Sequence, residues 1–362
     1  MLPVHIINPR TDTENSIHIG EELESLIKTQ GGLIVDRIMQ KMDRPNRATY
    51  VGKGKIEEIA AKVKEKDIDV VVLNVMVLPR QVHALKTELQ KTKPDIEVWD
   101  RVDLILKIFD QHAATTEAKL QIELARMNYM GPRIYGMGYV MSQQGGGIGS
   151  TGVGETNTEL MKRHWRDEKK KITDQLEKIN RSHEQQLERR KRIGFQTVSI
   201  VGYTNAGKSS LFNLLTKKGV LEKDVLFATL ASSVGRIYLE ELKTEVLITD
   251  TIGFIRDLPP LLVSAFKSTL MESIHADVLF HVIDVSDPEM DTKIAVVMKI
   301  LTDLGRNTDD MIFIFNKIDA ATDLDREAIL EKYGQYSPLF ISVRKEEGID
   351  EVRSIITKRL SE

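Results

Sequence analysis

Cysteine is absent from this chain of 362 residues, so it can form neither a disulfide framework nor a thiolate metal site. Long apolar runs are absent too. No segment approaches the length of a membrane span, and the N-terminal MLPVHIINPR lacks the apolar stretch of a signal peptide. We therefore expect a cytoplasmic protein without integral membrane association. Its composition, 41% hydrophobic and 29% charged, is typical of a soluble globular protein, and its length predicts two or three domains.

The strongest motif in the sequence is a phosphate-binding loop. It fits the pattern G-x-x-x-x-G-K-[ST] without a mismatch and consists of Gly202, Tyr203, Thr204, Asn205, Ala206, Gly207, Lys208 and Ser209. The glycines let backbone N–H groups turn toward a β-phosphate, the lysine adds a charge against the β- and γ-phosphates, and the serine hydroxyl is a Mg²⁺ ligand. An apolar strand over 198–201 precedes the loop and a helix follows it, which is the context that predicts a nucleotide site.

Two later segments supply groups for the γ-phosphate and the metal. The first consists of Phe227, Ala228, Thr229 and Leu230, and the second of Asp250, Thr251, Ile252 and Gly253. The Thr229 hydroxyl can complete the Mg²⁺ shell when a γ-phosphate draws its loop in. Asp250, at the end of a buried strand, can hold Mg²⁺ through water, and the Gly253 N–H can reach the γ-phosphate. We assign catalytic roles to Lys208, Thr229 and Gly253, and metal binding to Ser209, Thr229 and Asp250.

The base is predicted by a third segment, which follows an apolar strand that begins at residue 312. It consists of Asn316, Lys317, Ile318 and Asp319. The Asp319 carboxylate can accept both donors of guanine, and adenine presents no such pair. Asn316 can hold the loop and N7, while the Lys317 stem can lie over the ring. A last strand ends in Ser342, Val343 and Arg344, whose backbone N–H groups can reach the guanine O6. The order of these five elements predicts a GTPase.

The residue that follows the Asp-x-x-Gly segment is Phe254, where many GTPases have a glutamine that orients the attacking water. Phenylalanine cannot bond to water, so we expect slow intrinsic hydrolysis that depends on a partner. The alternative interpretation of Phe254 is a core aromatic. Arg236 and Arg256 are the candidates for an arginine finger.

Ahead of the nucleotide-binding segment, strands alternate with helices over residues 1–112 and predict a small α/β domain. One predicted strand spans 33–39. The loop before residue 56, with Gly52, is either an anion site or a solvated turn. Residues 113–193 predict an antiparallel helical hairpin, with helices over 113–130 and 155–192 around a flexible glycine-rich tip. Residues 162–192 contain 12 Lys and Arg against 6 Asp and Glu, while the whole chain has a net charge of −3. This excess is either a solvated face or, as we expect, an RNA-binding surface.

These motifs resemble the HflX family of ribosome-associated GTPases over nearly the whole chain. The resemblance lies in Arg44-Pro-Asn-Arg-Ala-Thr-Tyr-Val-Gly-Lys-Gly-Lys, in Ala118-Lys-Leu-Gln-Ile-Glu-Leu-Ala, in Gly145-Gly-Gly-Ile-Gly and in Asp250-Thr-Ile-Gly-Phe-Ile-Arg-Asp-Leu-Pro. It implies an α/β domain over 1–112, the hairpin over 113–193 and a Ras-like G domain over 194–362. It also implies a factor that binds the large ribosomal subunit and separates stalled or idle ribosomes into subunits. The chain departs from the family pattern at Thr151, Val153 and 231–233.

Two other functions stay open at this point. One is a ribosome-assembly or RNA-chaperone GTPase, and the other is a GTP-gated module that binds a protein partner. The ligands that we expect are GTP and GDP with Mg²⁺, and the expected macromolecular partner is ribosomal RNA of the large subunit. We expect a monomer and no DNA partner.

Overall fold

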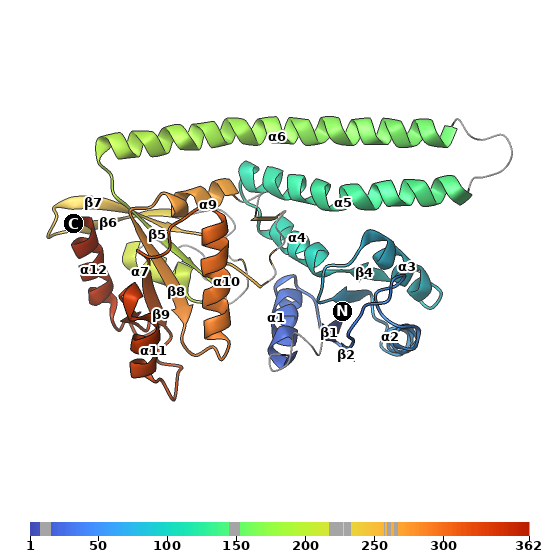
Figure 1. Cartoon of the computed structure of the whole chain (residues 1–362), viewed down its shortest axis with the longest axis horizontal. Helices are drawn as coiled ribbons and strands as arrows, with labels where there is room; N and C mark the ends of the chain where they lie inside the picture. Colours follow the sequence, from blue (N-terminus) through green and yellow to red (C-terminus); the bar gives the residue numbers. More distant parts are fainter. Residues whose placement is uncertain are drawn as a thin grey trace. The chain divides into compact units, whose positions relative to one another are not determined.

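The computed structural model describes residues 1–7, 16–144, 153–216, 227, 233–256, 258, 262–263 and 267–361. The chain forms two compact units. Unit 1 comprises residues 1–111 and 120–175, and unit 2 comprises residues 112–119 and 176–362. Each unit has its own sheet (Figure 1), and each has its own apolar core. In the part of the chain that is described, no helix combines the length and apolar character that crossing a bilayer requires.

Unit 1 is built on a four-stranded parallel sheet in the order β2-β1-β3-β4. Its first elements are β1 (Leu2–Ile7), α1 (Ser16–Thr29), β2 (Ile38–Lys41), α2 (Lys53–Glu65), β3 (Val70–Leu73), α3 (Pro79–Gln90), β4 (Glu97–Trp99) and α4 (Arg101–His112). All four residues of β3 are buried, as its run of β-branched side chains predicts. Pro79 opens α3, where its missing N–H breaks no helical hydrogen bond. The predicted small α/β domain is confirmed.

Two long helices, α5 (Thr116–Gln144) and α6 (Val153–Ile193), follow. They run antiparallel in Figure 1, and Glu117 of α5 faces His183 of α6 at 3.6 Å between carboxylate and ring nitrogen. Ile172 and Leu176 of α6 are buried, as their spacing predicts. The predicted antiparallel hairpin is therefore confirmed. Residues 145–152 of its glycine-rich tip lie outside the described residues.

Unit 2 contains a six-stranded sheet in the order β10-β9-β8-β5-β7-β6, in which only the β6–β7 pair is antiparallel. Its elements are β5 (Thr197–Gly202), α7 (Lys208–Thr216), β6 (Ser233–Leu239), β7 (Thr244–Asp250), α9 (Lys267–Ile274), β8 (Val278–Asp284), α10 (Met290–Asp303), β9 (Ile312–Asn316), α11 (Arg326–Tyr333), the 3₁₀ turn Gly334–Tyr336, β10 (Leu339–Phe340) and α12 (Ile349–Ser361). The central strand β5 is buried between β7 and β8, and it leads directly into the predicted phosphate loop.

Two predicted elements differ from the structure, and one strand of unit 2 was not predicted. The strand predicted over 33–39 lies instead at Ile38–Lys41. Leu33, an apolar residue on which that prediction rested, is 81% exposed. The helix predicted to end at residue 130 continues through Gly131 and Pro132 to Gln144. A proline removes one helical hydrogen bond, which a helix of 29 residues tolerates without ending. Strand β6, at one edge of the sheet, was not predicted at all.

Candidate functional site

The loop between β5 and α7 depends on two glycines. The φ angle of Gly202 is +152°, and a Cβ there would lie 2.2 Å from the carbonyl oxygen of Val282. The φ angle of Gly207 is +96°, and a Cβ there would lie 2.2 Å from Nδ2 of Asn316. Side chains at either position would collide with groups that cannot easily move. Asn205 also adopts a positive φ, +63°, which asparagine tolerates better than most residues.

Lys208 is the first residue of α7, and its side chain turns back over the loop. Its ammonium group donates a hydrogen bond to the Tyr203 carbonyl at 2.8 Å, and the residue is only 6% exposed. Burial lowers the pKa of Lys208 to about 8, against the opposing effect of the Asp250 carboxylate. A Cβ on Gly253 would lie 2.9 Å from the ammonium nitrogen. The structure therefore brings the lysine of the loop together with both ends of the Asp-x-x-Gly segment.

Two oxygen groups predicted to bind a metal are in direct contact. The Ser209 hydroxyl donates to Oδ2 of Asp250 at 2.6 Å, and Asp250 is fully buried at the end of β7. The Thr251 hydroxyl donates to the Ile200 carbonyl at 2.9 Å and so holds the turn after β7 against β5. A hydroxyl and one carboxylate fit Mg²⁺, which takes few protein ligands and completes its shell with phosphate oxygens and water. Within the described ranges, no three His, Cys, Asp or Glu side chains form a metal cluster of their own.

Asn316 joins the phosphate loop to the segment predicted to read the base. Its side-chain amide donates to the Ala206 carbonyl at 2.9 Å, and its amide oxygen accepts from the Val343 N–H at 3.1 Å. Asp319 is held from the other side, because its Oδ1 accepts from the Ser342 hydroxyl at 2.6 Å. This hydrogen bond keeps the pKa of Asp319 below its ordinary value. An ionised carboxylate at this place can accept the two donors of guanine.

Lys317 is positioned by a carboxylate that the sequence analysis did not single out. Its φ angle is +66°, and its ammonium group pairs with Oδ2 of Asp284 at 2.7 Å. Asp284 is the last residue of β8, directly opposite Asn316 of β9 in the parallel register. Asp284 also accepts from the hydroxyl of Ser286 at 2.6 Å. The available signal was its place at the end of a buried strand, since the carboxyl ends of parallel strands meet at one edge.

Phe254 is a core residue, as the alternative interpretation of this position states. The residue is 2% exposed. Its N–H donates to the Gly202 carbonyl at 3.1 Å, and its carbonyl accepts from the Thr204 N–H at 2.8 Å. The segment after β7 is thus hydrogen-bonded to both sides of the start of the phosphate loop. No glutamine side chain stands at this position to orient water.

The two candidate arginine fingers are both in ion pairs. The Arg256 guanidinium pairs with Oε1 of Glu289 at 2.8 Å, and its backbone N–H donates to the Tyr203 hydroxyl at 2.6 Å. Glu289, only 8% exposed and just ahead of α10, was another residue that the sequence analysis missed. Arg236 pairs with Glu245 at 3.2 Å across strands β6 and β7, where both side chains are exposed. Each of the two guanidinium groups is thus held by a carboxylate.

The remaining predicted site residues fall into two groups. Phe227 is buried and has a φ of +60°. The other described residues, Ile252, Ile318 and Arg344, belong to the Asp-x-x-Gly segment, the Asn-Lys-x-Asp segment and the segment 342–344. Ala228, Thr229 and Leu230 lie outside the described residues. The predicted role of Thr229 in the metal shell therefore stays a prediction.

The phosphate loop, the Asp-x-x-Gly segment and the Asn-Lys-x-Asp segment lie at the carboxyl ends of neighbouring strands of one sheet, where open α/β sheets bind their ligands. This fold and this set of residues define a P-loop GTPase. Three family models match the chain: "GTP-binding GTPase N-terminal" over residues 18–110, "GTP-binding GTPase Middle Region" over 112–190 and "50S ribosome-binding GTPase" over 197–317.

Relatives that match nearly the whole chain identify the family within the P-loop GTPases. The chain is 41% identical to GTPase HflX of Caldanaerobacter subterraneus subsp. tengcongensis, over 94% of this chain and 76% of the relative. It is 36% identical to GTPase HflX of Escherichia coli, over 94% of this chain and 79% of that protein. Its fold matches the crystal structure of SsGBP in complex with GDP, with a TM-score of 0.54, 25% identity and coverage of 100% and 99%. The chain belongs to the HflX family of GTPases.

Proposed function

We propose that this GTPase binds the large ribosomal subunit and separates stalled or idle ribosomes into subunits, with hydrolysis stimulated by the ribosome. The observation that carries the proposal is the match of residues 197–317 to the family model described as a 50S ribosome-binding GTPase. The basic part of α6 supports it, because residues 162–192 carry twice as many Lys and Arg as Asp and Glu. Ribosomal RNA is the polyanion such a surface suits. We further propose that the protein acts in the cytoplasm as a monomer.

In this proposal, residues 202–209 wrap the β-phosphate with backbone N–H groups, and Lys208 neutralises charge on the β- and γ-phosphates. P-loop GTPases use Mg²⁺ with their nucleotide, and Ser209 and Asp250 would hold it here, with Thr229 joining in the GTP state. The bound ion would neutralise charge that develops on the transferred phosphoryl group. Gly253 would offer its N–H to the γ-phosphate. The 2.6 Å contact between Ser209 and Asp250 supports the pairing of these two as ligands.

Guanine would be read by the second half of the site. Asp319 accepts from N1–H and the N2 amine, and the backbone of residues 342–344 donates to O6. Asn316 holds this half to the phosphate loop through its bond to the Ala206 carbonyl. The ion pair with Asp284 fixes the end of Lys317, so that its stem can lie along the face of the ring. Asp284 is thus a positioning residue in this proposal.

Hydrolysis would depend on the ribosome because the chain supplies no water-orienting side chain at residue 254. The core position of Phe254 and the ion pair of Arg256 leave the orientation of water to the partner. We also propose the functional division into an α/β domain over 1–112, a hairpin over 113–193 and a G domain over 194–362. The ranges of the three family models support this division.

Sedimentation tests the proposal directly. Intact ribosomes are mixed with the protein and a non-hydrolysable GTP analogue, and the subunits are separated on a density gradient. We expect intact ribosomes to be converted into subunits with the analogue and not with GDP. In parallel, large subunits should raise the GTP turnover of the protein. If the protein sediments only with subunit precursors, the assembly alternative holds. If large subunits leave turnover unchanged over a wide concentration range, the partner-dependent mechanism is wrong.

A further inference from the structure

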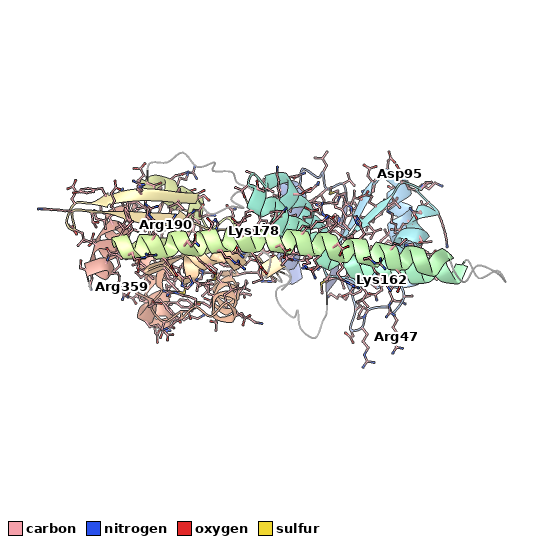
Figure 2. All side chains as sticks on the ribbon, turned by 90° about the horizontal axis from the view of Figure 1, so that it is seen from above. Arg47, Asp95, Lys162, Lys178, Arg190 and Arg359 are labelled. Carbon is pink, nitrogen blue, oxygen red and sulfur yellow. The ribbon has the colours of Figure 1, made fainter. Side chains whose placement is uncertain are left out.

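A pocket of about 620 Å³ lies within unit 2, away from the nucleotide site. It forms where the C-terminal end of α6 meets strands β6 and β7 and the last residue of α7, Thr216. Figure 2 shows Arg190, one of its lining residues, on the end of α6 above the strands of unit 2. Neither the motifs of the GTPase site nor its mechanism uses this pocket.

Three arginines line the pocket: Arg189 and Arg190 on α6 and Arg236 on β6. Arg189 is exposed and forms no ion pair among the described residues. Among the described residues, Arg236 pairs with Glu245 at 3.2 Å, and this pair is exposed to solvent, where such pairs contribute little. The pocket therefore keeps a positive charge. Guanidinium groups offer forked pairs of donors, which match the oxygens of a phosphate.

At the end of α6, a backbone hydrogen bond closes the last turn. Gly194 adopts a φ of +80°, and the Phe195 N–H donates back to the Arg190 carbonyl at 3.0 Å. This is the arrangement with which many helices satisfy their terminal carbonyls. The Arg190 carbonyl is thereby satisfied, and the side chains of Arg189 and Arg190 supply positive charge at this end of α6.

The rest of the pocket is apolar and incompletely covered. Ile193 is 60% exposed, which is unusual for an isoleucine, and Phe195 beside it is half-buried. Val234 and the buried Leu247 complete this wall. An aromatic side chain next to cations is the combination with which proteins hold single-stranded nucleic acid, the base on the ring and the phosphate on the cations. The volume falls in the range of small-ligand sites.

We propose that this pocket binds one unpaired nucleotide of an RNA strand, with its phosphate on Arg189 and Arg236 and its base against Phe195. A free nucleotide and an RNA strand both present a nucleoside phosphate. We infer RNA because helix α6, which lines the pocket, carries an excess of positive charge along residues 162–192. The identification of that RNA as ribosomal rests on the proposed function. The proposal that the pocket binds RNA does not.

The test uses the full chain with GDP bound and a fluorescein-labelled oligouridine of ten nucleotides, followed by fluorescence anisotropy at several salt concentrations. We expect Arg189→Ala/Arg236→Ala to weaken binding at least tenfold and to flatten the salt dependence. Phe195→Leu should weaken binding about fivefold or more without changing that slope. The matched control is Arg181→Ala, on the same helix but outside the pocket, and it should change affinity less than about twofold. GDP affinity of Arg189→Ala, which lies outside the nucleotide site, reports that unit 2 is folded.

Three results would overturn the proposal. Equal losses per arginine removed in Arg181→Ala and in Arg189→Ala/Arg236→Ala would show that only overall positive charge attracts RNA. Displacement of the oligomer by free uridine monophosphate with equal affinity would assign the pocket to free nucleotides, and equal displacement by polyglutamate would assign it to acidic peptides. Ribosome sedimentation separates the two proposals. Oligouridine binding by the pocket without subunit separation rejects the proposed function alone, and subunit separation with unaltered oligouridine binding in the variants rejects the pocket alone.

Discussion

Lys208 is the cation at the centre of the phosphate loop, and its ammonium group donates to the loop carbonyl of Tyr203. We expect Lys208→Ala to lower GTP turnover by about 10²–10³, the usual loss when one oxyanion-type contact is removed. Steady-state phosphate release measures this, with Lys358→Ala on the exposed surface of α12 as the control. Turnover close to that of the parent protein would contradict the assignment.

Asp319 is expected to select the base. An amide in its place can donate to the O2 of xanthine but can no longer accept both donors of guanine. We therefore expect Asp319→Asn to lose affinity for GTP and gain affinity for XTP. Titration with fluorescent analogues of both nucleotides measures the change. Equal GTP affinity in the variant and the parent would remove Asp319 from the base site.

His281, in the centre of the sheet on β8, is expected to make the stability of unit 2 depend on pH. Burial, together with the smaller effect of the Lys208 charge, lowers its pKa to about 3. In the unfolded chain its pKa is about 6.5, so between these values only the unfolded state takes up the proton. The free energy of unfolding should therefore fall as the pH decreases from about 6.5, by up to about 1.4 kcal/mol per pH unit.

His281→Phe tests this, because it removes the titrating group and keeps a ring for the edge contact with Phe313 at 5.0 Å between centroids. The pH slope of the variant should be smaller by about one proton between pH 4 and 6. Pulse proteolysis in urea suits the measurement, because Trp99 and Trp165 both lie in unit 1 and do not report on unit 2. Identical slopes would mean that His281 is protonated in the folded state.

At the scale of elements, the segment after β7 is fastened to α10 by the Arg256–Glu289 pair, whose side chains are 17% and 8% exposed. Glu289→Gln leaves a largely buried guanidinium without its counter-charge, so we expect a loss of about 2–4 kcal/mol in stability. Arg256→Met/Glu289→Leu removes both charges and should be less destabilising than the single change. Calorimetry of the three proteins measures this. A double variant less stable than Glu289→Gln would show that the loss in the single variant does not come from a buried guanidinium without its counter-charge.

Elements with strong local patterns were predictable, and those defined by distant contacts were not. The phosphate loop, β3 and α6 have spacing or composition that decides their structure locally. Strand β6 shows only a short alternation at Gly235, Ile237 and Leu239, and it becomes a strand by pairing with β7. In α5, propensity alone favours an end at Gly131, yet helix length and context outweigh it.

The same distinction holds for the site. Residues within a motif were predicted because their spacing is fixed by the phosphates or the base. Asp284 and Glu289 were missed because each meets its partner only after the sheet has placed β8 beside β5 and β9. The residue pattern of one strand does not predict which side chain of another element will contact it in the folded sheet. Thr229 remains a prediction from sequence.

At the scale of the whole molecule, we expect the glycine-rich segment between α5 and α6 to be needed for action on the ribosome and not for folding. Residues 145–154 lie far along the chain from every predicted nucleotide contact. We therefore expect that replacing them with a short turn leaves GTP affinity and thermal unfolding almost unchanged, but abolishes subunit separation and ribosome-stimulated turnover.

Nucleotide titration and ribosome sedimentation must be made on the same shortened protein. A variant of equal length in which residues 145–154 are replaced by a Gly-Ser sequence separates the effect of length from that of composition. Full subunit separation by the shortened protein would make the segment a simple connection. Lost GTP affinity would make it part of the fold.

Unit 2 is made of two separate segments of the chain, and their positions determine when this unit can fold during translation. Residues 112–119 belong to it, but they are synthesised before residues 120–175 of unit 1 and long before β10 at Leu339–Phe340. At about 5–20 residues per second, the roughly 220 residues in between take about 11–44 s to translate. Unit 1 can fold on the nascent chain during this time, while the phosphate loop still lacks β8 and the amide of Asn316 that hold it. Loading with nucleotide is therefore one of the last events in the biosynthesis of each molecule.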